Sequence, residues 1–382
     1  DENQLRIRQR VDGVLQETVI PEKSIAAALV LRLKLMAGLD ISEKRLPQDG
    51  RTQIKVKGHK IDVRLSTMPV QGGESVVMRL LDQSAGLLTL EQTGMPSAQL
   101  TRFRNLLRRP HGMILVTGPT GSGKTTTLYG ALSELNTAKS KIITVEDPVE
   151  YRLPRINQVQ VNPKINLTFS NVLRTTLRQD PDIIMVGEMR DQETVEIGLR
   201  GALTGHLVLS TLHTNDAISS VVRLLDMGAP GYLVASSLRG IIAQRLVRRI
   251  CDNCTTSYTP TDDEKVWLNG IDENAADVAF KQGRGCQKCN QTGYRGRIGV
   301  FELLEMSENM MNHLKASDIQ GFSNAATKSA GYRSLPQSAL TYAKMGVTSV
   351  EEVLKLVEMV AQDAPSSETT DHATSHHGAT GQ

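Results

Sequence analysis

The chain has 382 residues, which at about 150 residues per domain corresponds to two or three domains. Its 44 Lys and Arg residues nearly balance 41 Asp and Glu residues, so the formal net charge is only +3, and 39% of the residues are hydrophobic. This balance is typical of a globular protein and argues against a strongly basic nucleic-acid coat protein. The longest apolar helical stretch, Ser24 to Leu39, contains Arg32 and Lys34 and is shorter than the ~18 uncharged residues that a membrane span needs. We therefore expect no transmembrane helix.

The first part of the chain alternates apolar and polar residues as strands do. Such alternation is clear in residues 4–8 and 61–65, and an amphipathic helix is expected over residues 24–39. Residues 1–83 therefore predict a small α+β domain. No basic-then-apolar leader precedes Asp1, so we expect no secretory signal, and we expect a fragment without its original N-terminus.

A linker is expected over residues 84–95, because the sequence around Gln83-Ser84-Ala85-Gly86 lacks an apolar period. Pro96 then opens a predicted helix that ends before Pro110. A new domain is expected to follow this helix.

From Met113 onward, short continuous apolar runs alternate with helical periods. The runs cover residues 113–117, 142–145, 183–186 and 207–212. Uninterrupted runs are typical of parallel strands whose two faces are both covered by helices. Helices are expected at Asp191–Leu203 and from Asn215 to Met227, with Asn215 as N-cap and Gly228 as the C-terminal stop. The pattern predicts an α/β nucleotide-binding core over residues 96–249.

One segment between the first run and the next helix has the pattern of a P-loop. It reads GPTGSGKT from Gly118 to Thr125. In this motif, glycines allow backbone N–H groups to surround phosphates, the lysine reaches the β- and γ-phosphates, and the hydroxyl of the last residue binds Mg²⁺. We therefore expect a RecA-like P-loop core that binds ATP and Mg²⁺, with Lys124 on the phosphates and Thr125 on the metal. The expected nucleotide-binding residues are Gly118, Pro119, Thr120, Gly121, Ser122, Gly123, Lys124, Thr125 and Thr126.

Acidic residues follow two of the predicted strands. Glu188 ends the apolar strand that begins near Asp182, where a Walker B carboxylate would bind the Mg²⁺ shell or the attacking water. An ordinary core strand with a solvated terminal glutamate is the alternative. Glu146, Asp147 and Glu150 follow the strand at 142–145, and one or two of them are expected to hold metal-bound water. We take Glu146 and Glu150 as the catalytic candidates.

Two histidines flank the strand at residues 207–212. His206 and His213 are candidates for donating to the γ-phosphate or for carrying a signal between subunits. A structural role is an equally good interpretation of each, because a single histidine is more often structural than catalytic.

All four cysteines occur as two Cys-x-x-Cys pairs, Cys251/Cys254 and Cys286/Cys289. Two such pairs predict a structural Zn²⁺ with four thiolate ligands in a segment of residues 250–298. Disulfides or a redox dithiol are the alternatives, but disulfide-rich domains are small and dense in cysteine. A C-terminal helical region is expected at 299–362, followed by a disordered tail at 363–382 that is rich in Ser, Thr, His and Gly.

Taken together, these motifs resemble the secretion ATPase superfamily of type II secretion and type IV pilus assembly. The strings that carry the resemblance are VEDPVEYR (145–152), LRQDPDIIMVGEMRD (177–191), GHLVLSTLHTND (205–216) and QRLVRRICDNC (244–254). They are similar to the family's Asp box, Walker B strand, His box and entry to the zinc segment. The four cysteines favour assembly ATPases over retraction ATPases. The chain is most similar to the ATPases of mannose-sensitive haemagglutinin-type pili, with type II secretion ATPases as near neighbours.

The resemblance implies a homohexamer in the cytoplasm, at the inner face of the bacterial inner membrane, that works with a platform protein of the pilus or secretion machine. It also implies that Arg64 and Arg79, with Arg51 as a weaker candidate, reach the γ-phosphate when the N-terminal domain closes over the nucleotide. Family members carry a further N-terminal module outside this sequence, to which partner docking and any cyclic dinucleotide regulation belong.

Two other classes of protein remain as alternatives. In a DNA-translocating or conjugation-type P-loop ATPase, the arginines of two expected helices would line a path for a phosphate backbone. These are Arg102, Arg104, Arg108 and Arg109 in one helix and Arg245, Arg248 and Arg249 in the other. The near-neutral charge and 3% aromatic content argue against nucleic-acid binding. A zinc-stapled adaptor that only binds nucleotide is disfavoured by the intact Lys124, Thr125 and Glu188.

Overall fold

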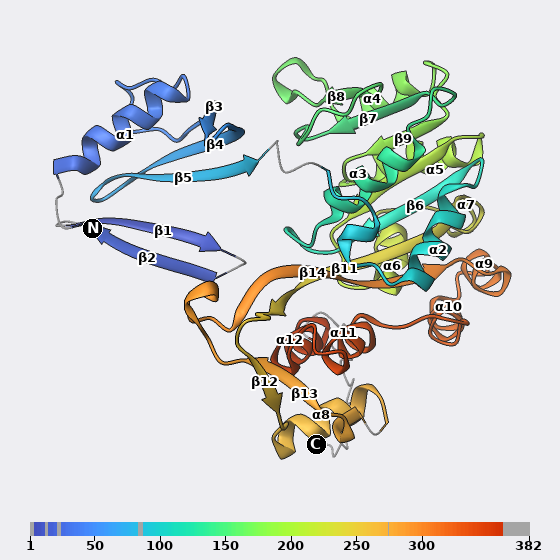
Figure 1. The fold of residues 1–382 in the computed structure, drawn as a ribbon. Coiled ribbons are helices and arrows are strands. Elements are labelled where there is room, and N and C mark those ends of the chain that lie inside the picture. Colours follow the sequence, from blue (N-terminus) through green and yellow to red (C-terminus); the bar gives the residue numbers. More distant parts are fainter. Residues whose placement is uncertain (1–3, 12–13, 21–23, 83–86, 274, 362–382) are drawn as a thin grey trace, which may run out of the picture.

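A seven-stranded sheet forms the centre of the molecule. The computed structural model describes residues 4–11, 14–20, 24–82, 87–273 and 275–361 (Figure 1). The strand order is β14-β11-β6-β10-β9-β7-β8, in which only β14 is antiparallel to its neighbour. The strands are β6 (Gly112–Thr117), β7 (Ile142–Glu146), β8 (Asn157–Gln160), β9 (Ile183–Val186), β10 (Leu207–Leu212), β11 (Leu238–Ile250) and β14 (Tyr294–Glu305). The α/β prediction with a parallel core is therefore confirmed.

Helices cover both faces of this sheet, which explains its continuous apolar strands. Alternate residues of β6 enter two different cores: Met113 and Leu115 pack in one, and Ile114 and Val116 in the other. The second core also receives α2 (Ser97–Leu107) and α3 (Lys124–Leu135). The first core receives α4 (Phe169–Thr176), α5 (Gln192–Leu203), α6 (Ala217–Asp226) and α7 (Gly231–Ser237).

The ends of two of these helices show which residues cap them. Asp191 caps α5 by accepting a hydrogen bond from the backbone N–H of Thr194 at 2.8 Å. The expected cap of α6 at Asn215 is wrong by one residue, because the carboxylate of Asp216 accepts from the backbone N–H of Ser219 at 2.7 Å. Gly228, with φ of +89°, follows α6 as expected.

β11 replaces an expected helix. Arg245, Arg248 and Arg249 lie in this strand, so the Arg-rich helix considered for a DNA path is not formed there. Arg248 pairs with Glu351 and Glu352, and Arg102 of α2 pairs with Glu305, so these cations meet acidic side chains of the same chain.

The N-terminal elements form two separate sheets. β1 (Leu5–Val11) and β2 (Val14–Ile20) make a hairpin, which Figure 1 shows apart from the other sheet. α1 (Ser24–Met36) packs on a three-stranded antiparallel sheet of β3 (Gln48–Val56), β4 (His59–Val70) and β5 (Gly73–Asp82). α1 ends three residues before the expected Leu39, and the expected linker start at 83–86 lies outside the described residues.

The C-terminal part begins with a small two-stranded sheet and ends in helices. The sheet pairs β12 (Thr255–Tyr258) with β13 (Phe280–Gly283) antiparallel, and the helices are α8 (Asp262–Ile271), α9 (Glu308–Lys315), α10 (Ile319–Thr327), α11 (Leu335–Lys344) and α12 (Val350–Ala361). Short 3₁₀ turns occur at Glu91–Thr93 (η1), Pro163–Ile165 (η2), Ala275–Asp277 (η3) and Gln287–Cys289 (η4).

Two sequence expectations concern the C-terminal part, one about a domain boundary and one about the tail. The boundary expected between residues 298 and 299 falls inside β14, which runs from the cysteine segment into the main sheet. The expected disordered tail at 363–382 lies outside the described residues. Among the helices of the described residues, none has both the length and the apolar character to span a bilayer.

Candidate nucleotide and metal sites

The P-loop connects the end of β6 to the start of α3, as the sequence predicted. Gly118 has φ of +147°, and a Cβ there would lie only 2.4 Å from the backbone oxygen of Gln244, so this position needs glycine. Lys124 is 9% exposed, and its Nζ donates to the carbonyls of Gly118 at 2.6 Å and Pro119 at 3.0 Å. Burial lowers the pKa of Lys124 to about 8, the charge of Glu188 opposes this, and the charge of Arg245 adds to it.

The loop also has the features of an anion site. Within the described part of the chain, the Ser122 hydroxyl is buried without a hydrogen-bond partner. The N-terminus of α3, which no side chain caps, adjoins the same loop, where the helix dipole favours a negative charge. A phosphate chain fits these donors. Thr125 and Thr126, on the first turn of α3, have exposed side chains that can meet a metal or a phosphate.

Glu188 and His213 lie together at the carboxyl edge of the sheet, where the P-loop also lies. Glu188 follows β9 and His213 follows β10, and His213 Nε2 is 3.6 Å from Glu188 Oε2. Glu188 also forms an ion pair with Arg190. Burial, with the positive charge of Lys124 as the second cause, lowers the pKa of His213, so its imidazole is neutral near pH 7. A carboxylate and a neutral imidazole therefore face the space beside the P-loop lysine.

The two glutamates of the Asp box have different surroundings. Glu146 is buried at the end of β7 and accepts hydrogen bonds from the Tyr129 hydroxyl, from Thr144 Oγ1 at 2.5 Å and from Gln158 Nε2 at 3.1 Å. Burial, with the hydrogen bond to Glu146 next, raises the pKa of Tyr129. Glu150 instead accepts hydrogen bonds from the two terminal guanidinium nitrogens of Arg64, Nη1 at 3.3 Å and Nη2 at 2.5 Å. Glu146 thus belongs to a buried network, whereas Glu150 contacts the N-terminal sheet.

The three candidate arginines form one row across that N-terminal sheet. Arg51 of β3 is opposite Arg64 of β4, which is opposite Arg79 of β5. Directly opposed residues of antiparallel strands project from the same face. A cavity of about 260 Å³ between this sheet and the core is lined by Arg51, Asp62, Arg64 and Val149, among others. The sequence prediction for Arg64 and Arg79 thus corresponds to a cationic row on the face from which Arg64 reaches the core.

His206 is not brought to this place. It precedes β10, so the six residues of that strand separate it from the P-loop edge, a length of about 20 Å. Its Nδ1 is 2.9 Å from the Gly201 carbonyl at the end of α5. Position therefore argues against donation from His206 to a γ-phosphate at the P-loop of the same chain, whereas the structural role and signalling between subunits both stay predictions.

Several polar residues around the P-loop were not predicted as part of the site. Thr117, the last residue of β6, is 2.5 Å from the hydroxyl of Thr214, next to His213. Arg245 Nη2 donates to Asn215 Oδ1 at 2.7 Å, and Gln244 accepts from Thr127 Oγ1 at 2.7 Å. A Gln-Arg pair inside the apolar run of β11 is the sequence signal that would have indicated them, since buried polar side chains need partners.

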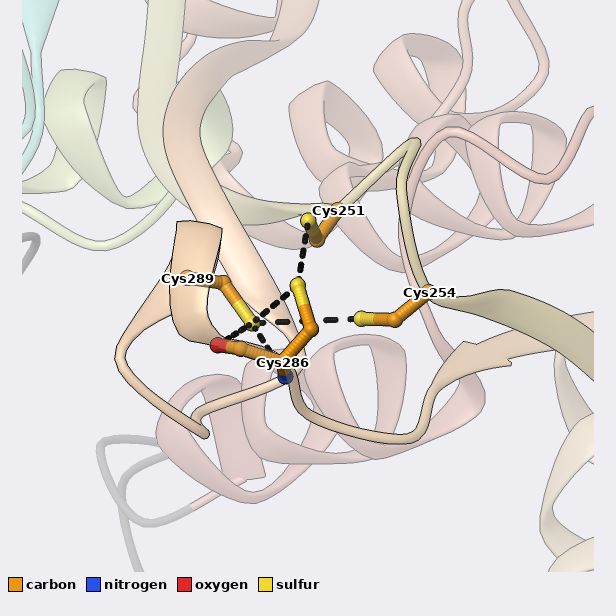
Figure 2. A group of neighbouring side chains, drawn as sticks. All are labelled: Cys251, Cys254, Cys286 and Cys289. Carbon is orange, nitrogen blue, oxygen red and sulfur yellow. Dashed lines mark hydrogen bonds between the residues drawn. The ribbon is translucent and has the colours of Figure 1, made fainter.

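The four cysteines form a compact cluster in which all sulfurs lie within 4.8 Å of one another (Figure 2). The Sγ–Sγ distances are 3.9 Å for Cys251–Cys286, 3.8 Å for Cys254–Cys289 and 3.7 Å for Cys286–Cys289. Zn–S bonds of about 2.3 Å in a tetrahedron place sulfurs ~3.8 Å apart, whereas a disulfide needs about 2.05 Å. The four cysteines are free, so the disulfide alternative is wrong and the cluster fits Zn²⁺.

Backbone and side-chain N–H groups support these sulfurs. Cys289 Sγ accepts from the backbone N–H of Cys286 at 3.2 Å and of Gly293 at 3.3 Å, and Cys286 Sγ accepts from Asn253 Nδ2 at 3.4 Å. Such donors stabilise thiolates, which are the form that binds the metal.

A P-loop after a central parallel strand, with an acid and a neutral histidine at the adjacent strand ends, defines a P-loop ATPase. The chain belongs to the family described as "Type II/IV secretion system protein", which matches residues 1–355. It is therefore a secretion ATPase, and the resemblance inferred from its motifs is confirmed at the level of the family.

Relatives with similar sequences support this assignment. The chain is 50% identical over 350 residues to the type II secretion system protein HxcR of Pseudomonas aeruginosa, covering 92% of this chain and 71% of that protein. It is 47% identical over 361 residues to the type II secretion system ATPase E of Vibrio cholerae, covering 94% and 70%. The greater similarity to mannose-sensitive haemagglutinin-type pilus ATPases stays a prediction.

Solved structures share the fold. A structure of the pilus retraction motor PilT with bound ADP is 28% identical, with a TM-score of 0.61 over 91% of this chain and 89% of that one. The Legionella pneumophila ATPase DotB is 19% identical, with a TM-score of 0.67 over 94% and 92%, and shows the shared fold alone.

Proposed function

We propose that this secretion ATPase is a cytoplasmic homohexamer that hydrolyses ATP with Mg²⁺ and powers assembly of a type II secretion pseudopilus or a type IV pilus. The names of the relatives favour the secretion machine, and PilT supports the relation to pilus motors. The proposed place of action is the inner face of the bacterial inner membrane, with a platform protein as partner. Regulation by a cyclic dinucleotide would belong to a module outside this sequence.

Each residue of the nucleotide site has a proposed task. Lys124 and the P-loop N–H groups bind the β- and γ-phosphates, and Thr125 with Glu188 would hold Mg²⁺, which would supply positive charge to offset that of the phosphates. Glu188 orients the attacking water, and the neutral His213 beside it donates a hydrogen bond toward the γ-phosphate. Glu146 keeps the end of β7 in place through its buried hydrogen bonds rather than touching the nucleotide.

The observation that carries the motor proposal is the ion pair between Arg64 of the N-terminal sheet and Glu150 of the core. Arg64 lies in a row with Arg51 and Arg79, and three cations repel one another unless an anion lies nearby. A γ-phosphate would attract this row toward the P-loop more strongly than a single carboxylate does. We propose that this attraction closes the N-terminal sheet over ATP and that hydrolysis releases it.

For the cysteine cluster we propose a structural Zn²⁺. All four ligand positions of a tetrahedral ion are supplied by Cys251, Cys254, Cys286 and Cys289, so none is left open for a substrate. The ion would hold the segment between β11 and β14 in place.

The test of the ATPase site compares Glu188→Gln with Lys124→Ala. We expect Glu188→Gln to keep ATP affinity while turnover falls by about 10² or more, because the amide cannot activate water or balance Mg²⁺. Lys124→Ala should lose ATP affinity itself. ATP binding by equilibrium titration, turnover by phosphate release and hexamer formation by light scattering are the measurements. Unchanged turnover in Glu188→Gln would contradict the assignment, and a monomer with full turnover would contradict the hexamer.

A further inference from the structure

Gln244 is the first residue of β11 that lies level with the P-loop. β11 runs parallel to β6, and Ala243 is opposite Thr117, the last residue of β6 before the loop. Gln244 is a polar residue in a largely apolar strand, and it is only 2% exposed. Burying an amide without a partner costs free energy, so a specific contact is expected here. That contact is with α3, where Thr127 Oγ1 donates to Gln244 Oε1 at 2.7 Å.

The same residue fills the space beside two glycines of the loop. A Cβ at Gly118 would lie 2.4 Å from the backbone oxygen of Gln244, and a Cβ at Gly123 would lie 2.7 Å from its Nε2. Gly118 begins the loop and Gly123 is the N-cap of α3. Gln244 therefore contacts the beginning of the loop, its end, and the first turns of the helix that follows.

We propose that Gln244 is a positioning residue of the ATPase reaction, which holds the P-loop in its phosphate-binding shape through the hydrogen bond with Thr127 and its packing on Gly118 and Gly123. It acts through the loop and not on the nucleotide. This role of Gln244 requires neither a hexamer nor a particular transported substrate.

β11 also extends to the cysteine cluster. β11 continues from Gln244 to Ile250, directly before Cys251, and pairs with β14 along this length. Gln244, which contacts the P-loop and α3, and Cys251 of the cysteine cluster are thus joined by one strand, β11.

The experiment measures nucleotide affinity and turnover of the full chain carrying Gln244→Leu, Thr127→Val, both, or Thr127→Ser. One neutral hydrogen bond corresponds to about three- to tenfold in an equilibrium constant. We expect Gln244→Leu and Thr127→Val each to weaken binding of a fluorescent ATP analogue by this factor and to lower kcat at saturating ATP. Thr127→Ser, which keeps the hydroxyl, should behave as the original protein.

The double variant distinguishes positioning from general destabilisation. Both single changes remove the same hydrogen bond. The double variant should therefore lose no more affinity for the ATP analogue, and no more kcat, than the more impaired single variant. Gln320→Leu, on the exposed surface of α10, is the matched control and should change neither quantity. The proposal would be overturned if Gln244→Leu folds and keeps its affinity and kcat. It would also be overturned if the fold-losses of the two single variants multiply in the double variant. If Gln244→Leu does not fold, Thr127→Val decides, since equal behaviour of Thr127→Val and Thr127→Ser also overturns it.

Discussion

At the residue scale, strand direction decides which candidates act together. The P-loop, Glu188 and His213 each follow a parallel strand, and the carboxyl ends of such strands meet at one edge of the sheet. This group could be predicted from sequence, because each motif directly follows an apolar run. His206 precedes its strand, β10, and therefore lies at the amino end of the strand, away from the edge that carries the P-loop. The direction of the strand was enough to predict this from the sequence. The arrangement of Glu146 and Glu150 could not be predicted, because their partners Tyr129 and Arg64 are distant in sequence.

Arg64 provides the first prediction at this scale. Its side chain is 19% exposed and that of Glu150 is 26% exposed, so their ion pair contributes only about 1 kcal/mol or less to stability. If Arg64 reaches the γ-phosphate, Arg64→Ala should lower kcat by about 10³ with only a small change in melting temperature. Arg64→Lys should recover part of the rate, because it keeps the charge but not the bidentate fork.

The control for this prediction is Arg8→Ala, an exposed arginine of β1. Turnover and melting temperature of the three variants are measured under the same conditions. A large drop in melting temperature with normal kcat in Arg64→Ala would mean that the residue only tethers the N-terminal sheet.

At the scale of elements, sequence patterns predicted four buried strands of the central sheet and missed β11, a strand of the same sheet that carries buried polar residues. β6, β7, β9 and β10 are buried along their whole length, as their continuous apolar runs indicate. β11 contains Gln244, Arg245 and Arg248, whose partners lie on α3, at Asn215 and on α12. These tertiary contacts make a strand of a segment whose charges suggested a helix, and no local pattern contains them.

The cysteine cluster gives a prediction about β11 and β14. Cys251 directly follows β11, and Tyr294, five residues after Cys289, begins β14, so a metal at the cluster would join the outer ends of this strand pair. Cys286→Ser should release the metal and lower the melting temperature, because metal affinity contributes directly to folding. Metal content by atomic emission and thermal unfolding are the measurements.

Ser257→Ala, in the neighbouring β12 but outside the cluster, is the control and should keep the metal. If the purified native protein contains no metal and has the same melting temperature as Cys286→Ser, the cluster holds no stabilising ion.

At the scale of the whole molecule, one buried carboxylate joins three parts of the fold. Glu302 of β14 is 1% exposed and accepts hydrogen bonds from the backbone N–H of Ala217 at 2.9 Å and of Leu335 at 3.1 Å, and from the Tyr332 hydroxyl at 2.9 Å. Ala217 begins α6, which follows the His213 loop, and Leu335 begins α11 in the C-terminal region. Glu302 of the main sheet is therefore hydrogen-bonded both to the helix that follows the nucleotide edge and to the C-terminal region.

This junction predicts a specific pH dependence of stability. Burial raises the pKa of Glu302 from 4.5 to about 7, and its hydrogen bonds only partly offset that effect. The folded protein then binds more protons than the unfolded chain between these two values, so the contribution of Glu302 to stability falls as pH rises from 4.5 to about 7. In Glu302→Gln this titration is absent. The melting temperature of Glu302→Gln relative to the original protein should therefore rise between pH 5 and about 7.5 and level off above that. Tyr332→Phe removes one donor to the carboxylate, so the pKa of Glu302 in the folded protein should rise further and the decline of stability should extend to higher pH. Melting temperatures of all three proteins that change in parallel across this pH range would contradict a raised pKa of Glu302.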